Sequence, residues 1–222
     1  MHMYPSAHRI NGCNQLFVLC AFLVFSAAAQ ASSVKAINGN LYFINDAGKS
    51  SQITKQMSDT QPVLSPDKTK IAFVRALPKR EIQEADNEPW MQATADVEIW
   101  TIDTTGADAQ RVVATHIDND NNEKNLAQFN TLVFSLDGKQ LYFLSKAWVA
   151  SYGLHVVNLE NHQVHYLTDA NGVRVINRGH YAGNLIVEKR TYSTGAEGGA
   201  YATFSLFTPQ GAYVKRLGKR QK

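Results

Sequence analysis

A short strand-turn-strand pattern occurs twice in the middle of the chain in nearly the same form. Residues 62–68 lead into an apolar run at 71–74, and residues 132–139 lead into a second apolar run at 141–144. In both copies an aspartate marks the turn between two short apolar segments, which is the pattern of a β-hairpin. A hairpin of this kind cannot bury its own sheet, so the repeat predicts a fold in which copies stack against one another.

A second hairpin follows each copy of this pattern. In one case, residues 97–102 and 110–113 are apolar segments joined by a turn at 103–106. Comparable hairpins occupy residues 40–54, 154–168 and 203–217. Four copies at intervals of about 50 residues match the repeat length of four-stranded propeller blades.

The repeats predict an all-β chain folded as a β-propeller of about four blades, with roughly 15 strands. No segment shows a convincing helical period. We expect the first blade to be incomplete, because only residues 34–37 and an Asn38-Gly39 turn precede its strand at 40–44. Since about four blades is the lower limit for a closed ring, three alternatives remain: the ring closes on itself, stays open or is completed by a second chain.

Residues 62–74, 97–113 and 132–168 resemble the TolB-like β-propeller repeat. Its pattern is Ser-Pro-Asp-Gly-Lys, then an apolar strand, then a hydrophobic hairpin ending in a turn of the Asp-x-x-Gly kind. Lys68 stands where the pattern has Gly, Leu136 stands where it has Pro, and the last repeat departs throughout. The resemblance implies the propeller fold. It leaves the function open, because such repeats occur in periplasmic translocation scaffolds and in propellers appended to serine peptidases.

The N-terminal segment differs in composition from the rest of the chain. Arg9 precedes an apolar run at 16–29 that ends in Ala29-Gln30-Ala31. This arrangement is typical of a secretory signal peptide, so we predict a signal peptide at 1–31 and a propeller domain at 32–222. An uncleaved anchor is the alternative, but the run is too short for an ordinary transmembrane span. We therefore expect no membrane span after cleavage, and a periplasmic or secreted protein.

Cysteine content and charge narrow the possibilities further. Cys13 and Cys20 both lie in the segment expected to be removed, so the mature chain has no disulfide and depends on a packed core. The 22 basic and 19 acidic residues nearly cancel, which argues against nucleic acid as a partner.

Connection lengths predict where a binding surface would lie. Consecutive strands run in opposite directions, so the connections of a blade alternate between two ends of the propeller. Tight turns such as 65–68 fall at one end, whereas the long connections fall at the other, at 76–96, 115–129, 146–153 and 190–202. We expect function at this long-loop end, because loops on a rigid scaffold often carry binding residues.

Aromatic residues beside Arg and Lys at that end are typical of protein-recognition sites. The predicted binding residues are Arg75, Trp90, Glu123, Asn125, Lys146, Trp148, Tyr152, Arg190 and Tyr192. The alternative for Trp90 and Trp148 is that they fold back to cover blade edges.

Calcium binding and serine-hydrolase chemistry are the two chemical alternatives that the sequence raises. The run from Asp118 to Glu123 is rich in oxygen ligands, but an EF-hand would need Gly at 123 and Glu at 129, where the chain has Glu and Phe. A loop that satisfies its own backbone is favoured there, and a non-standard calcium site stays open. No Gly-x-Ser-x-Gly turn supplies a serine nucleophile. We therefore predict no catalytic residues, no metal centre and no cofactor, and a protein that is not an enzyme.

Together these features predict an exported, non-enzymatic binding module or scaffold for a protein or cell-envelope component, with a homo-oligomer as one way to complete the ring. The alternative is a propeller enzyme or carbohydrate-binding protein with its site in the central funnel. The innermost strands expected at 61–65, 129–135 and 173–177 are mostly apolar, which counts against a funnel site.

Overall fold

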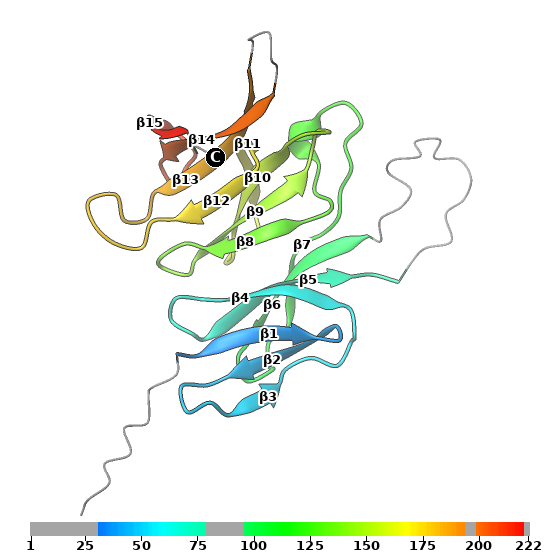
Figure 1. The fold of residues 1–222 in the computed structure, drawn as a ribbon. Coiled ribbons are helices and arrows are strands. Elements are labelled where there is room, and N and C mark those ends of the chain that lie inside the picture. Colours follow the sequence, from blue (N-terminus) through cyan, green and yellow to red (C-terminus); the bar gives the residue numbers. More distant parts are fainter. Residues whose placement is uncertain (1–30, 79–95, 194–198, 220–222) are drawn as a thin grey trace, which may run out of the picture.

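The structure is a computed structural model that describes residues 31–78, 96–193 and 199–219. These residues form fifteen strands in four antiparallel sheets, numbered here as blades 1 to 4 (Figure 1). Blade 1 consists of β1 (Ser33–Ile37), β2 (Asn40–Ile44) and β3 (Ser50–Gln52). Blade 2 consists of β4 (Asp59–Leu64), β5 (Lys70–Ala76), β6 (Val97–Asp103) and β7 (Gln110–Val113).

The second half of the chain forms two further complete blades. Blade 3 consists of β8 (Asn130–Phe134), β9 (Gln140–Lys146), β10 (Tyr152–Asn158) and β11 (Val164–Ala170). Blade 4 consists of β12 (Gly172–Val175), β13 (Leu185–Tyr192), β14 (Ala200–Phe207) and β15 (Tyr213–Lys219). One turn of 3₁₀ helix, η1 (Asn122–Lys124), lies between β7 and β8. The predicted all-β fold of about four blades is confirmed.

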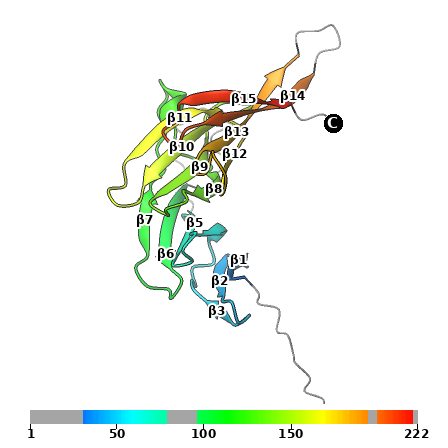
Figure 2. The same cartoon turned by 90° about the vertical axis from the view of Figure 1, so that its left-hand side faces the viewer.

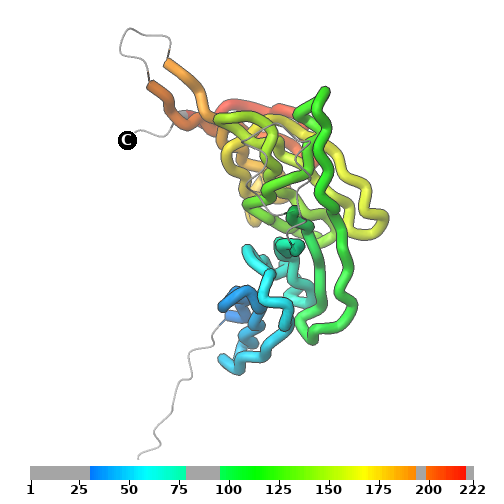
Figure 3. The backbone as a smooth tube through the Cα atoms, turned by 90° about the vertical axis from the view of Figure 1, so that its right-hand side faces the viewer, coloured from blue at the N-terminus to red at the C-terminus, as the bar shows by residue number. Residues whose placement is uncertain are grey.

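The blades stack side by side in an arc. Within each blade the strands pair in sequence order, and the innermost strands β4, β8 and β12 contact one another from blade to blade. Blade 1 and blade 4 lie at opposite ends of the arc in two perpendicular views (Figures 1 and 2). The described residues of one chain therefore form an open arc that does not close on itself (Figure 3).

Blade 1 is incomplete at its inner side. The backbone N–H of Leu41 donates to Thr54 Oγ1 at 3.0 Å, and the N–H of Val97 donates in the same way to Thr115 Oγ1 at 3.1 Å. These matching bonds align β2 and β3 with the two outer strands of blade 2. β1 then corresponds to the second strand of a complete blade, so the described residues of blade 1 include no counterpart of the innermost strand.

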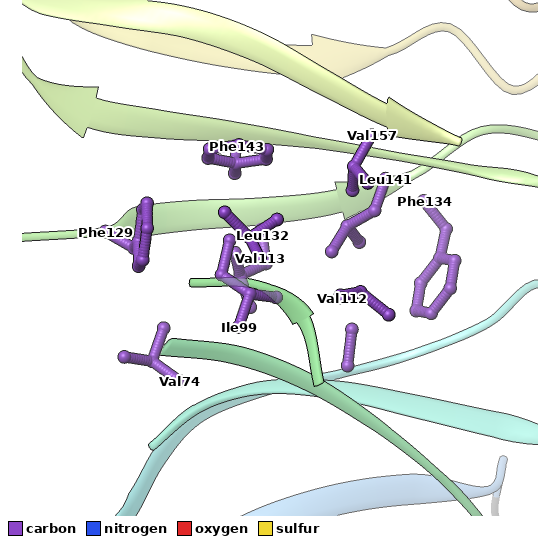
Figure 4. Packing of buried hydrophobic residues seen from close by; sticks show 11 residues of the cluster. Val74, Ile99, Val112, Val113, Phe129, Leu132, Phe134, Leu141, Phe143 and Val157 are labelled. Carbon is purple, nitrogen blue, oxygen red and sulfur yellow. The ribbon is translucent and has the colours of Figure 1, made fainter. Parts of the chain in front are cut away.

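The hydrophobic core is divided among the three interfaces between blades. Ile71 and Phe73 of β5 pack with Leu41 of blade 1, whereas Ala72 and Val74 pack with residues of blade 3. Figure 4 shows this second cluster, in which Val74, Ile99, Val112 and Val113 of blade 2 meet Phe129, Leu132, Phe134, Leu141, Phe143 and Val157. Because both faces of a central strand are covered, its sequence reads as a continuous apolar run.

The repeated Ser-x-Asp turn has the same hydrogen bonds in both copies. Ser65 Oγ donates to Asp67 Oδ1 at 2.5 Å and accepts from the N–H of Lys70 at 2.9 Å. In blade 3 Ser135 Oγ donates to Asp137 Oδ1 at 2.6 Å and accepts from the Gln140 N–H at 3.0 Å. The serine hydroxyl thus closes the turn and sets the register of the next strand.

The residue after the aspartate of each turn has a positive φ, and this is where Lys68 departs from the TolB-like repeat pattern. Gly138 has a φ of 69°, in the left-handed region that glycine enters without steric cost. Lys68 occupies the equivalent position in blade 2 with a φ of 63°. A side chain in this region is strained, so blade 2 folds in spite of its lysine.

Candidate functional site

The connections divide between two ends of the arc largely as predicted. The long connection 114–129 lies at one end, where β5 also ends and β6 begins, and tight turns at 65–69, 104–109, 135–139 and 159–163 lie at the other. Two lengths differ from expectation. The link between β11 and β12 is Asn171 alone, at the long-loop end, whereas the link between β12 and β13 spans 176–184, at the tight-turn end.

Two predicted loops are shorter than expected, because strands extend into both of them. β9 runs to Lys146 and β10 begins at Tyr152, so the loop between them is only 147–151. β13 runs to Tyr192 and β14 begins at Ala200, and this hairpin projects beyond the rest of blade 4 (Figures 1 and 3). Arg190 and Tyr192 therefore lie on a strand instead of a loop.

Arg75, which was predicted as a binding residue, lies on β5 and is held by contacts inside the protein. Its Nε and Nη2 atoms donate to Asp59 Oδ1 and Oδ2 at 2.6 and 3.0 Å, and the Asp59 side chain is 0% exposed. The guanidinium also lies over the rings of Phe73 and Trp100, at 5.1 and 4.6 Å from their centroids. The Arg75 guanidinium is thus bound by Asp59 and covered by the rings of Phe73 and Trp100, so it is not available to a partner.

The loop that precedes β8 is folded down onto blade 3. Asn125 is buried, and its Oδ1 accepts from the Asp118 N–H at 2.7 Å. Ser145 Oγ, on β9, donates to the Asn125 carbonyl oxygen at 2.7 Å. Asn125 is thus a structural anchor, a role that the sequence reading missed.

Asp118 shows how the run from Asp118 to Glu123, which is rich in oxygen ligands, is used. Its Oδ1 accepts from the N–H groups of Asp120 and Asn121 at 3.0 and 2.9 Å, and its Oδ2 lies 3.4 Å from Lys124 Nζ. The two backbone bonds lower the pKa of Asp118. The loop therefore satisfies its own backbone, and the described part of the chain contains no group of three His, Cys, Asp or Glu placed to hold a metal ion.

His155 fixes the same loop from the side of β10. Its Nε2 lies 2.9 Å from the Glu123 carbonyl oxygen, and its Nδ1 lies 3.1 Å from the Gly153 carbonyl oxygen. The ring is stacked on Phe143 and almost fully buried, and this burial lowers its pKa. Gly153 makes room for it, since a Cβ there would lie 2.8 Å from His155 Cε1. Glu123 is therefore held through its backbone, and its side chain is exposed.

The loop at 147–151 forms the exposed tip of blade 3. Lys146 Nζ donates to the Val149 carbonyl oxygen at 3.2 Å and lies 5.4 Å from the centroid of the Tyr152 ring. The N–H of Trp148 donates to the Ser151 carbonyl oxygen at 3.1 Å, which closes the turn. Val149 is 98% exposed, so the turn presents an apolar side chain to solvent.

Asn171 connects this tip to blade 4. Its Nδ2 donates to the Ala150 carbonyl oxygen at 2.8 Å, and its Oδ1 accepts from the Arg190 N–H at 2.9 Å. The Arg190 guanidinium lies 5.6 Å from the centroid of the Tyr192 ring, and Tyr192 is 58% exposed. A single amide side chain therefore joins two groups of predicted residues that are far apart in the sequence.

We name the resulting area the blade 3–4 loop surface. It is defined by Lys146, Trp148, Val149, Tyr152, Arg190 and Tyr192. Arg75 and Asn125 are placed elsewhere by their buried contacts, and Trp90 lies outside the described residues. Sequence reasoning missed Asn171 and Val149, because neither a one-residue connection nor an exposed valine has a recognisable motif.

The solved structures that resemble this chain are propellers. TolB from Acinetobacter baumannii matches with a TM-score of 0.55 and 14% identity, over 86% of this chain and 40% of that chain. The β-propeller domain of the Trilobed protease from Pyrococcus furiosus, described as having an open velcro topology, matches with a TM-score of 0.51 and 17% identity, over 85% of this chain and 53% of that chain. No protein-family model and no curated protein matches the sequence.

These likenesses support a TolB-like propeller fold and no more, since the identities are low. The chain also spans only about half or less of the length of these solved chains. Among the described residues, no helix is long and apolar enough to cross a membrane.

The prediction that the chain is not an enzyme is corrected by the same comparison. Dipeptidyl peptidase 4 from Porphyromonas gingivalis matches with a TM-score of 0.50 and 12% identity, over 84% of this chain and 31% of that chain. Enzymes are thus among the proteins that share the fold. A propeller without a nucleophile motif can therefore belong either to an enzyme or to a non-enzymatic binding protein.

Proposed function

We propose that this protein is an exported propeller that binds a protein or cell-envelope component through its blade 3–4 loop surface. The observation that carries the proposal is the link through Asn171, which holds the tip of blade 3 against β13. This link supports a shared surface that includes Trp148 and Tyr152 of blade 3 and the Arg190–Tyr192 pair of blade 4. Aromatic and arginine side chains on a fixed frame are the usual anchors of protein interfaces, because little conformational entropy is lost when they are buried.

Exposure supports the choice of this surface within the long-loop end. Val149 and Tyr192 project into solvent from two neighbouring blades, whereas Arg75 and Asn125 are already used inside the protein. Large apolar groups that no neighbour covers are common at sites where a partner covers them. The proposed location is the periplasm or the extracellular space, because a cleaved signal peptide at 1–31 would export residues 32–222.

Site-specific photo-crosslinking in cells tests the surface directly. A photoreactive residue at Val149 should give a defined adduct with one partner, and the same residue at Leu136 should not. Leu136 is a matched control, because it is exposed on the tight turn between β8 and β9, at the other end of the arc.

Two further results decide the proposal. Combining Trp148→Ala with Arg190→Ala should abolish the Val149 adduct while the thermal unfolding of the purified protein stays unchanged. An adduct that forms equally from Val149 and Leu136, or that survives the double substitution, would exclude this surface. Export is tested separately by N-terminal sequencing of the secreted or periplasmic protein, which should begin at Ser32.

A further inference from the structure

The outermost strand of blade 4 is a long edge strand, and its side chains from 213 to 217 are exposed. β15 pairs with β14, and no second strand pairs with it in the described part of the chain. It runs along the outer rim of the molecule (Figure 2). With 7 residues it is as long as β11, the outermost strand of blade 3, and longer than the outermost strands of blades 1 and 2, which have 3 and 4. A long edge strand offers a row of backbone N–H and C=O groups to another strand.

β15 carries a pair of basic residues with apolar residues on both sides. Tyr213 is 62% exposed and Leu217 is 44% exposed, and Val214 is exposed as well. Lys215 and Arg216 lie between these residues and are also exposed. Charged residues on an edge commonly prevent pairing with further strands, but here apolar groups flank them on both sides. The edge can therefore pair with a further strand, and the basic pair restricts which strands are favoured.

The basic pair disfavours one occupant, a second copy of the chain. If two β15 strands paired antiparallel about their centres, Lys215 and Arg216 of one copy would face the same cations of the other. Like charges directly opposite each other on neighbouring strands are destabilising, whereas opposite charges are stabilising. The favoured occupant therefore carries acidic residues at the central positions.

Lys215 is also held at the edge by a neighbour. Its Nζ lies 3.1 Å from the hydroxyl oxygen of Tyr181, and 4.5 Å from the centroid of that ring. Tyr181 belongs to the connection at 176–184, which is longer than the other turns at its end of the arc. This contact restrains the long lysine side chain, so less entropy is lost when a carboxylate binds.

We propose that β15 is a docking edge for an extended segment of a partner protein, in which two neighbouring acidic residues are flanked by apolar ones. The segment adds to blade 4 as a fifth strand. Backbone hydrogen bonds supply affinity in this mode, and side chains opposite the edge supply selectivity. The proposal is independent of the blade 3–4 loop surface, since the residues involved are different.

Binding of synthetic peptides to the full mature protein tests this edge. The probe is a short fluorescent peptide with two central glutamates flanked by valine and tyrosine, and its affinity is measured by fluorescence anisotropy. One comparison peptide carries lysines in place of the glutamates. A second comparison peptide keeps all side chains but carries N-methyl groups on alternate backbone nitrogens, at the edge that would pair with β15. This change removes the hydrogen-bond donors needed for strand addition.

Charge reversal in the protein completes the test. Arg216→Glu should weaken the acidic peptide by at least about fivefold and strengthen the lysine peptide, because one favourable cross-strand pair becomes unfavourable. Arg174→Glu is the matched control, since Arg174 is exposed on β12 of the same blade, and it should change the affinity less than twofold. Thermal unfolding of both variants shows that the fold is kept.

Three outcomes would overturn the proposal. The first is no binding of the acidic peptide below about 1 mM. The second is equal binding of the N-methylated peptide, which would mean side-chain attraction without strand pairing. The third is an equal loss in the Arg174→Glu and Arg216→Glu variants, which would indicate nonspecific attraction to the basic chain.

Discussion

Replacing Arg75 by alanine should destabilise the protein strongly, because the Asp59 carboxylate would be left buried without a counter-charge. The Asp59 side chain is 0% exposed and the Arg75 side chain only 13%, and two hydrogen bonds of 2.6 and 3.0 Å join them. Breaking a buried pair by removing one partner typically costs about 3–5 kcal/mol. We expect a loss of this size, seen as a fall in melting temperature of about 10 °C for a chain of this length.

Urea unfolding at neutral pH, followed by tryptophan fluorescence, measures the loss. Arg190→Ala is the control, because that guanidinium is exposed on the projecting hairpin, and its removal should change stability by less than about 0.5 kcal/mol. Asp59→Asn combined with Arg75→Leu should cost less than the sum of the two single changes, because neither charge is then stranded. A loss below about 1 kcal/mol for Arg75→Ala, or strict additivity in the double variant, would refute the argument.

Three other predictions concern the turns and the buried histidine. Lys68→Gly should raise the free energy of unfolding by about 1 kcal/mol, and Gly138→Ala should lower it by a similar amount, because both positions have positive φ. Chemical denaturation measures both changes. Opposite signs at both sites would contradict the steric argument. Hydrogen bonds from the Ser65 hydroxyl and the Thr69 backbone and hydroxyl lower the pKa of Asp67, so its contribution to stability is present above about pH 4 and is lost as pH falls through the folded pKa. Acid titration of Ser65→Ala should show a weaker acid dependence than the wild type, and identical curves would count against this bond. Burial lowers the pKa of His155, so stability should fall as pH drops below about 6.5, and urea melts of His155→Phe between about pH 5 and 7.5 should lose this dependence.

Much of the fold could be predicted from local patterns. The apolar runs at 71–74 and 141–144 became the second strands of blades 2 and 3, and the Ser-x-Asp turns before them have the same hydrogen bonds. Even the short first blade followed from counting strands before residue 40. These features depend on residues within a few positions of one another, so the sequence carries them without knowledge of the tertiary structure.

The candidate site was only partly predictable, because its contacts join residues far apart in the chain. Arg75 and Arg190 look alike in sequence, yet one is buried against Asp59 and the other is exposed over Tyr192. Nothing near Asn171 indicates that its amide connects Ala150 to Arg190.

The sequence alone determined that the chain is all-β, that it forms four blades and where the turns fall, because alternation and turn chemistry act over a few residues. Only the tertiary structure decided that the described residues form an open arc and which of the loop residues are exposed. Those outcomes depend on how neighbouring sheets pack and on which distant group satisfies each buried polar atom. A charge or an amide becomes part of the scaffold or of the binding surface according to the partner that the fold brings to it.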